Sequence, residues 1–188
     1  NGEVLDRIPL LRYFKVYNAE QCVNAPELPE IPEVDPVENY ENCQAMMGCY
    51  GISIEHGGSA ASYSITTDTI KIPETGQFKD VESYWSTLLH QAIHSTAHNG
   101  RLKRDIRNVA FERMASEIGA AFLCAQMGIE RDSLTANHAS YIAQYKTLLT
   151  EDPKAFMRAA KLARQAADYV LEYTGAGQYA ASEDEEAA

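Results

Sequence analysis

The sequence predicts an α/β (α+β) domain in which a small, mainly antiparallel sheet is packed on a helical bundle. Two patterns support this fold class. Between residues 52 and 72, apolar and polar side chains alternate in short runs bounded by turn residues, as in strands with one buried face. From residue 80 onward, apolar residues recur at spacings of three and four, as in amphipathic helices. The chain of 188 residues, 45% of them hydrophobic, is long enough for one domain with a sizeable core.

The composition excludes some functions and favours a reducing compartment. No run of about 18 apolar residues is present, so no membrane-spanning segment is expected. The net charge of −11 opposes non-specific binding to nucleic acid. The only basic patch consists of Arg101, Lys103, Arg104 and Arg107. The four cysteines form no C-x-x-C pair, which favours reduced, buried thiols in a cytoplasmic protein. The chain begins with neither Met nor a signal-peptide pattern, so we expect a fragment of a longer protein.

The first half of the chain is predicted to hold the strands and one helix. Residues 8–17 are rich in β-branched and aromatic residues and are predicted to form a strand. Residues 25–36 carry four of the seven prolines among acidic residues, which favours an extended connection. Helical spacing of apolar residues predicts a helix over 39–50, ended by Gly51. Three short strands are expected next, at 52–56, 62–65 and 69–72, with turns at 57–58 and 66–68.

Four helices are predicted after the strands. The first begins at Asp80 and runs to the helix-breaking pair Asn99-Gly100. The others are expected over residues 108–127, 133–149 and 153–173. Small residues in the 108–127 helix, such as Gly119, allow another helix to approach closely. We predict one domain over residues 1–174, followed by a disordered acidic tail over 175–188.

The chemistry is predicted in the helix that begins at Asp80. His90 and His94 lie four residues apart, so their imidazoles share a helix face and can hold one metal ion between them. This is the spacing of the His-Glu-x-x-His motif of zinc peptidases. Gln91 stands where that motif has the glutamate that takes a proton from zinc-bound water. Because an amide has no oxygen basic enough for this role, the chain is predicted to bind a metal but not to hydrolyse.

A third metal ligand is expected from the next helix, because a catalytic zinc takes three protein ligands. Glu117 and Glu112 are the candidates, and they lie about 140° apart around the helix, so they cannot share one role. Glu117 has the smaller neighbours and is favoured, with Glu112 as the alternative. His98 lies one turn past His94, but ligands on three successive turns would span about 12 Å. His98 is therefore predicted to support the site or the fold.

Several stretches together resemble the C-terminal metallopeptidase domain of ArdC-type antirestriction proteins, which also occurs in phage polyvalent proteins. The matching stretches are Arg7–Tyr13, Tyr63–Pro73, His90–Leu102, Ala110–Glu112, Glu117–Ala125, His138–Ala143 and Ala166–Tyr169. The resemblance implies a zincin-like fold, a zinc ion and a peptidase active site of the general kind seen in the ImmA and IrrE group. The family's domain follows a single-stranded DNA-binding domain, so we expect DNA to be contacted only through such an absent N-terminal domain.

The resemblance also assigns roles by position. His90 and His94 match the family's metal histidines, and Gln91 matches its general base. The family's next helix usually has two adjacent glutamates and a third four residues after the second. The corresponding positions in this chain are Glu112, Arg113 and Glu117. One acid is therefore replaced by arginine. Gln91 is either an engineered substitution or a natural loss, and we favour the former because a decaying site would tend to lose its histidines too.

The predicted function is a zinc metallopeptidase domain from a plasmid, phage or mobile element, acting on a protein or peptide substrate once glutamate is restored at position 91. The 63–72 region is expected to bind the peptide along a sheet edge, and Tyr141 or His138 to stabilise the oxyanion. The alternative is a non-catalytic protein-interaction module with a structural metal, assisting a DNA-binding domain in antirestriction. Zinc is the expected ion, manganese is open as well, and no membrane partner is expected.

Overall fold

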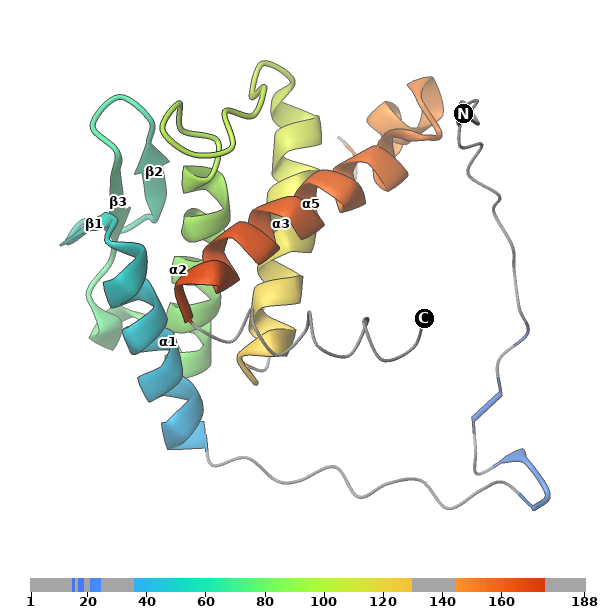
Figure 1. Cartoon of the computed structure of the whole chain (residues 1–188), viewed down its shortest axis with the longest axis horizontal. Coiled ribbons are helices and arrows are strands. Elements are labelled where there is room, and N and C mark those ends of the chain that lie inside the picture. The colour runs from blue at the N-terminus through green and yellow to red at the C-terminus, as the bar shows by residue number, and fades with distance from the viewer. Residues whose placement is uncertain (1–14, 16, 19–20, 25–35, 130–144, 175–188) are drawn as a thin grey trace, which may run out of the picture. The chain divides into compact units, whose positions relative to one another are not determined.

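The computed structural model describes residues 15, 17–18, 21–24, 36–129 and 145–174 (Figure 1). The chain divides into two compact units, Asn1–Glu33 and Val34–Ala188, and the described α-helices and strands belong to the second. Four predicted features lie wholly or mostly outside the described residues and stay predictions. They are the strand over 8–17, the connection over 25–36, most of the helix over 133–149 and the acidic tail over 175–188.

A three-stranded sheet follows the first helix. Helix α1 (Pro36–Tyr50) ends at Gly51, whose φ of 70° suits glycine, as the sequence predicted. The strands are β1 (Ser53–His56), β2 (Ser62–Ser64) and β3 (Thr69–Ile72), in the spatial order β1-β3-β2. The hairpin that joins β2 to β3 turns through Asp68 at a φ of 50°. The predicted strand positions are therefore confirmed to within a residue at each end.

The pairing of the strands corrects one prediction. β2 runs antiparallel to β3, but β1 runs parallel to it, so the sheet is mixed and not mainly antiparallel. Local alternation identifies a strand but does not say which neighbour it pairs with. Gly57 and Gly58, at φ of 140° and 75°, turn the chain away at the end of β1. A parallel pair needs a crossover between its strands, and β2 with its connections supplies it.

Helix α2 (Val81–Ser95) carries the two histidines. It begins after Asp80, as predicted, because the Asp80 carboxylate accepts a hydrogen bond of 2.8 Å from the backbone N–H of Ser83. The helix ends before the predicted Asn99-Gly100 pair. The backbone N–H groups of Thr96, Ala97 and His98 bond to carbonyls three residues back, which closes the chain into tight turns.

The remaining helices follow the predicted order. Helix α3 (Val109–Gln126) begins after Asn108, whose side chain caps it, and is followed by Gly128 at a φ of 65°. Helix α5 (Ala155–Leu171) begins just after Pro153 and buries its alanine stripe. The shorter helical pieces are η2 (Thr75–Gln77), residues 145–151 and η4 (Glu172–Thr174). Among the described helices, none is both long and apolar enough to cross a bilayer.

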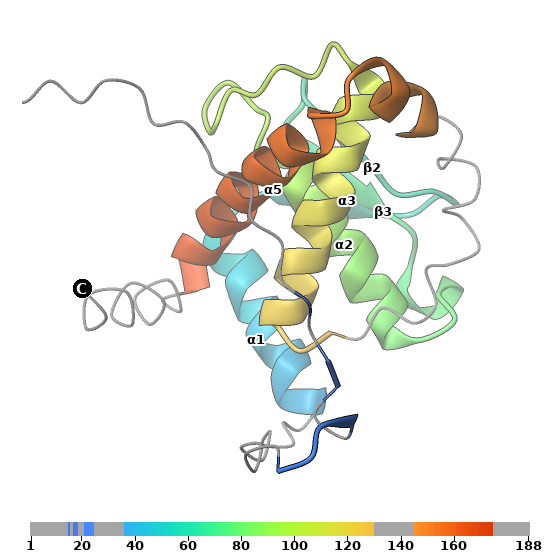
Figure 2. The same cartoon turned by 90° about the vertical axis from the view of Figure 1, so that its right-hand side faces the viewer.

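Packing of α2 against α3 sets the geometry of the site. α2 lies between the sheet and α3, and α5 crosses both helices (Figures 1 and 2). Gly119 of α3 faces Ile93 of α2, and a Cβ at position 119 would lie 3.0 Å from the Ile93 side chain. A larger residue would push the helices apart at the turn that carries His94. The close approach brings the first turns of α3 within reach of the α2 histidines.

The main core contains side chains from every layer. Its largest fully buried members are Met46, Ile70, Ile72, Leu88, Leu89, Ile93, Leu123 and Val170. Cys43 and Cys124 are buried in the same core. None of the four cysteines forms a disulfide; Cys43 and Cys124 are buried, as predicted, but Cys22 and Cys49 are exposed because they lie outside the core. Burial raises the pKa of Cys43 to about 12, so its thiol stays protonated and packs as an apolar group.

Candidate metal centre

Helix α2 brings the imidazoles of His90 and His94 together edge to face, with an interplanar angle of 74°. The two Nε2 atoms lie 3.1 Å apart, and the ring centroids are separated by 4.7 Å. Both side chains are partly buried, with exposed fractions of 18% and 26%. The i, i+4 spacing on one helix face produces this arrangement, as the sequence predicted.

Glu112 and Ser116 hold the opposite edge of the His94 ring. The His94 Nδ1 atom lies 3.3 Å from Glu112 Oε1 and 3.1 Å from Ser116 Oγ, and Ser116 Oγ donates to the same carboxylate oxygen at 3.1 Å. A carboxylate can only accept, so Nδ1 of a neutral His94 carries the ring hydrogen. Its Nε2 atom therefore presents a lone pair towards His90.

Glu117 lies at the corresponding edge of the other ring. Its Oε1 atom is 3.7 Å from His90 Nδ1, an ion-pair distance that is longer than a hydrogen bond. Both histidines thus have a carboxylate from α3 on their Nδ1 side. This is the usual support for metal-binding histidines, because a carboxylate at one ring nitrogen orients the ring and makes the other nitrogen a better ligand.

The histidine pair fits a metal ion. Two Zn–N bonds of about 2.0–2.1 Å at a tetrahedral angle place their nitrogens about 3.3 Å apart. The observed Nε2–Nε2 distance of 3.1 Å is close to this value. With its hydrogen on Nδ1, His94 presents an Nε2 lone pair to His90 at this distance, and a proton or a cation between the two nitrogens would satisfy it.

No third ligand completes the site among the residues that the structure describes. In residues 36–129 and 145–174, no three His, Cys, Asp or Glu side chains form a cluster arranged to hold a metal. Glu117 and Glu112, the two candidates from the sequence, each lie at an Nδ1 atom and not beside the Nε2 pair. The third-ligand assignment stays a prediction. His98 serves the turn after α2, where its Nδ1 accepts from the N–H of Gly100 at 3.1 Å.

A cleft of about 430 Å³ opens beside the histidines. Its lining includes Ser62 and Tyr63 of β2, His90, Gln91 and His94 of α2, and Arg113 of α3. Gln91 is buried yet lines the cleft, which is the place that a general base would take. Burial and a hydrogen bond to Asp68 raise the pKa of Tyr63 to about 12, so its phenol stays neutral. The predicted oxyanion residues Tyr141 and His138 lie outside the described residues.

Arg104 is a functional candidate that sequence reasoning missed. The sequence places it in a basic patch, but its side chain is only 4% exposed and its Nη1 atom donates to Glu112 Oε2 at 2.5 Å. Ser116 is missed as well, because the sequence shows it only as one of the small residues in the 108–127 helix. The signal that could have found Arg104 is its place in the short loop between the two helices that carry the site, since that loop must close over both helix ends.

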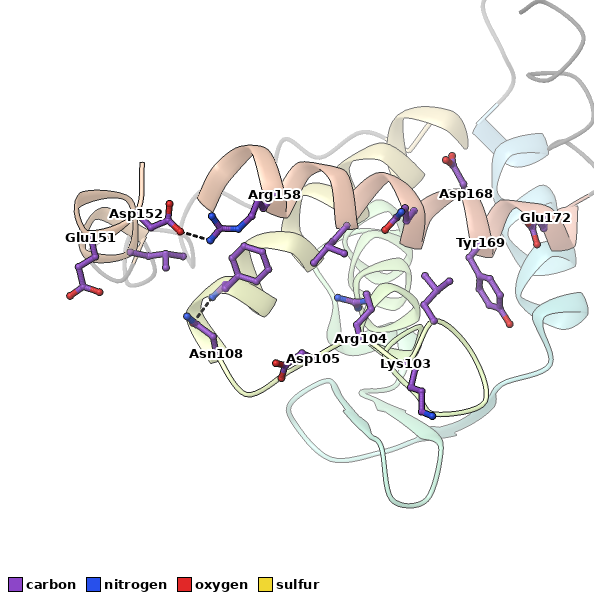
Figure 3. A pocket seen from close by; sticks show the side chains of 15 residues that line it. Lys103, Arg104, Asp105, Asn108, Glu151, Asp152, Arg158, Asp168, Tyr169 and Glu172 are labelled. Atoms are coloured by element: carbon purple, nitrogen blue, oxygen red, sulfur yellow. Dashed lines mark hydrogen bonds and ion pairs between the residues drawn. The ribbon is translucent and has the colours of Figure 1, made fainter. Parts of the chain in front are cut away.

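A larger hollow lies elsewhere on the molecule. This groove of about 940 Å³ runs between residues 102–108 and α5, and its labelled side chains include Arg104, Arg158 and Tyr169 (Figure 3). Arg158 pairs with Asp152 and lies over the ring of Phe111. The described lining contains neither histidine nor cysteine. The smaller cleft, which is lined by both histidines, is therefore the candidate for metal binding.

Two facing histidines on one helix, supported by acids from the next helix and lying beside a sheet, define the zincin class of metal-dependent peptidase folds. The model of the zincin-like metallopeptidase family matches residues 41–162, and the chain belongs to this family. The family resemblance and the fold class predicted from the sequence are thus confirmed. The zincin-like fold implies a divalent metal ion.

The fold of the chain is similar to two solved structures of one antirestriction protein. The chain is similar to the metal-free structure of antirestriction protein ArdC from plasmid R388, with 30% identity and a TM-score of 0.68 over 85% of this chain and 59% of that one. The Mn(II)-bound structure of the same protein matches with 30% identity and a TM-score of 0.66, over 84% and 60% of the two chains.

Sequence relatives are longer proteins. DNA primase TraC of Escherichia coli is 33% identical over 172 residues, which are 88% of this chain and 16% of that protein. The uncharacterized protein y4eC of Sinorhizobium fredii (strain NBRC 101917 / NGR234) is 35% identical over 126 residues, which are 64% of this chain and 41% of that one. The chain thus spans less than half of the length of these curated relatives.

Proposed function

We propose that this chain carries a divalent-metal site of the metallopeptidase type. The chain binds a peptide at this site but does not hydrolyse it. The observation that supports it best is the pair of Nε2 atoms 3.1 Å apart, each ring having a carboxylate at its Nδ1 atom. His90 and His94 would hold the ion, which is zinc or, as in the Mn(II)-bound relative, manganese. A bound divalent ion supplies Lewis acidity, which lowers the pKa of a coordinated water and polarises a carbonyl.

Gln91 is the reason for the proposed loss of hydrolysis. Its amide lies in the cleft at the position of the motif's glutamate. It can donate to or accept from a bound peptide, but it cannot hold the proton that hydrolysis must remove from water. Restoring glutamate at this position adds the missing base without changing the size of the side chain.

The peptide is proposed to bind along β2. β2 lies at the edge of the sheet and pairs with β3, and its other edge has no strand partner within the described residues. Ser62 and Tyr63 of this strand line the cleft together with the histidines. An extended peptide can add to such an edge by main-chain hydrogen bonds, which fix its direction while nearby pockets select its side chains.

The setting of the proposed function follows the relatives. We propose that the domain works inside a longer protein of a plasmid, phage or mobile element, in antirestriction, and that DNA is contacted by a separate N-terminal domain. The net charge of −11 supports a protein or peptide partner over direct DNA binding. The four cysteines, none of which forms a disulfide in this structure, support a reducing compartment, which we take to be the cytoplasm.

Metal binding is the first test. The parent chain, His94→Ala and His56→Ala are each equilibrated with Zn²⁺ or Mn²⁺, and bound metal per chain is measured by mass spectrometry. We expect one ion for the parent and for His56→Ala, and none for His94→Ala. His56 is a matched control because it is exposed at the end of β1 and bonds to Tyr84. A parent chain without metal would overturn the assignment.

The second test concerns hydrolysis. Gln91→Glu and the double variant Gln91→Glu/His94→Ala are incubated with a panel of unfolded proteins and with the chain itself, and fragments are identified by mass spectrometry. We expect cleavage by the single variant only, and no cleavage by the parent. Cleavage by the parent would contradict the role of Gln91.

A second candidate function is a protein-interaction module with a structural metal. Gln91 and Arg113 favour it, since the first replaces the base and the second puts a guanidinium group in the cleft wall. The hydrolysis test distinguishes the metallopeptidase-type site from the protein-interaction module. If metal-loaded Gln91→Glu cleaves nothing while the parent binds metal, the interaction module is the better description.

A further inference from the structure

We propose that Arg104 is a positioning residue of the metal centre, which fixes Glu112 and, through it, the ring of His94. This inference rests on the proposed metal site and extends it beyond the histidines and the α3 acids. The three side chains involved come from three different parts of the chain: α2, the loop after it and α3. They form one continuous hydrogen-bonded path.

The guanidinium group of Arg104 contacts three different acceptors. Its Nη1 atom donates to Glu112 Oε2 at 2.5 Å, its Nε atom to Thr96 Oγ1 at 3.1 Å and its Nη2 atom to the carbonyl oxygen of Ile93 at 2.8 Å. Ile93 immediately precedes His94 near the end of α2. Arg104 therefore ties the last turn of the histidine helix to the first turn of α3.

The two oxygens of the Glu112 carboxylate are divided between these contacts. Oε2 accepts from Arg104, while Oε1 faces His94 Nδ1 at 3.3 Å and accepts from Ser116 at 3.1 Å. With Oε2 held, the carboxylate cannot rotate about its last bond without breaking a charged hydrogen bond. Oε1 is thereby kept on the Nδ1 side of His94, which leaves Nε2 directed at His90.

The loop is shaped to deliver this side chain. Lys103, directly before Arg104, has a φ of 52°, a left-handed conformation that is uncommon for lysine. The backbone N–H of Lys103 bonds to the carbonyl of His98, and that of Leu102 to the carbonyl of Thr96, so the turn is closed on both sides. The side chain of Arg104 is 4% exposed, whereas that of Arg107 on the same loop is 90% exposed.

A purely structural brace is the competing explanation, and it makes a different prediction. A brace would lower stability when removed, but it would leave the metal affinity and the tautomer of His94 unchanged. A positioning residue changes both, because the Nδ1 hydrogen bond stabilises the tautomer that presents the Nε2 lone pair. Removing such outer contacts typically weakens metal binding about 10–100-fold.

The experiment compares Arg104→Gln and Arg104→Lys with Arg107→Gln as the matched control, all in the full chain. Affinity for Zn²⁺ and for Mn²⁺ is measured by competition with a chromogenic chelator. We expect a loss of about 10–100-fold for Arg104→Gln and a smaller loss for Arg104→Lys, since one ammonium cannot reach three acceptors in a plane. Arg107→Gln should stay within about twofold of the parent, because its contact with Asp105 is exposed.

A second readout needs no metal. Long-range ¹H–¹⁵N spectra of the histidine rings, recorded in EDTA, report which nitrogen carries the hydrogen. His94 should be the Nδ1–H tautomer in the parent and a mixture in Arg104→Gln. If Arg104→Gln does not fold, the same measurements are made on Arg104→Lys, which keeps the positive charge. Unchanged affinity and tautomer in a folded Arg104 variant would overturn the proposal. A parent that binds no metal would refute the proposed function, while the tautomer result would still decide the role of Arg104.

Discussion

The ion pair between Arg104 and Glu112 makes a sharp stability prediction, because a second ion pair on the same loop serves as its control. The side chains of Arg104 and Glu112 are 4% and 9% exposed, whereas those of Arg107 and Asp105 are 90% and 59% exposed. Both pairs join an arginine to a carboxylate at short range. They differ mainly in burial, so the same type of substitution should have very different effects.

Glu112→Ala removes one partner of the buried pair and leaves the guanidinium group of Arg104 without its counter-charge. Breaking a buried pair in this way costs about 3–5 kcal/mol, because the remaining charge stays out of water. Asp105→Ala breaks an exposed pair, for which about 0–1 kcal/mol is typical. A domain of this size has a free energy of unfolding of about 5–15 kcal/mol, so Glu112→Ala should remove a large fraction of it.

Urea titration of the metal-free proteins, followed by far-ultraviolet circular dichroism, measures both free energies of unfolding. The double variant Arg104→Met/Glu112→Leu adds a further check, since replacing both charges by apolar groups of similar volume is often close to neutral. We expect the double variant to recover most of the stability lost in Glu112→Ala but not the metal affinity. Equal losses for Glu112→Ala and Asp105→Ala would refute the reasoning from burial.

Three further predictions concern other parts of the unit. The hydrogen bonds from Arg101 hold the pKa of Asp68 below its ordinary value of 3.8, so this carboxylate stabilises the fold above about pH 4 and less as the pH falls through its lowered pKa. The difference in unfolding free energy between the parent and Asp68→Asn should therefore be full at pH 7 and shrink below pH 4, and a constant difference would contradict this. Gly128→Ala should lower the free energy of unfolding by about 1–2 kcal/mol in urea titration, because a Cβ at a φ of 65° is strained and would lie 2.5 Å from the side chain of Asn39. An unchanged urea midpoint of unfolding would contradict this. Arg113→Glu replaces a cation in the cleft wall by a possible ligand and should tighten Zn²⁺ binding about tenfold or more in the chelator competition, whereas weaker binding would show that the arginine supports the site.

The sequence was sufficient for most element positions in the described part of the chain. Asp80 and Asn108 are N-caps with polar side chains ahead of apolar stripes, and both helices begin where these signals predict. The sequence predicts the end of α2 too late: the carbonyl of Ile93 accepts from the N–H of Thr96, three residues on, and also from Arg104, eleven residues on. Such a contact depends on the folded loop and leaves no periodic trace in the sequence.

The candidate site was predictable in its histidines but not in its supports. The spacing of His90 and His94 fixes their relation within one helix, so no tertiary information was needed. The roles of the α3 acids depend on how closely two helices pack, which in this fold is set by Gly119 against Ile93. The sequence does not show whether a glutamate on a neighbouring helix faces the Nδ1 atom or the Nε2 atom of a histidine.

That distinction changes what the site can do. A carboxylate at Nδ1 raises the electron density at Nε2, so Glu112 and Glu117, as placed in this structure, would strengthen His90 and His94 as ligands and would not themselves complete the coordination sphere. Within the described residues the ion would then rest on two neutral nitrogens, with its full charge directed into the cleft. Such an ion attracts the carbonyl or carboxylate oxygens of a peptide lying along β2. With Gln91 unable to take a proton, we infer that the cleft is better suited to holding a peptide than to cutting it.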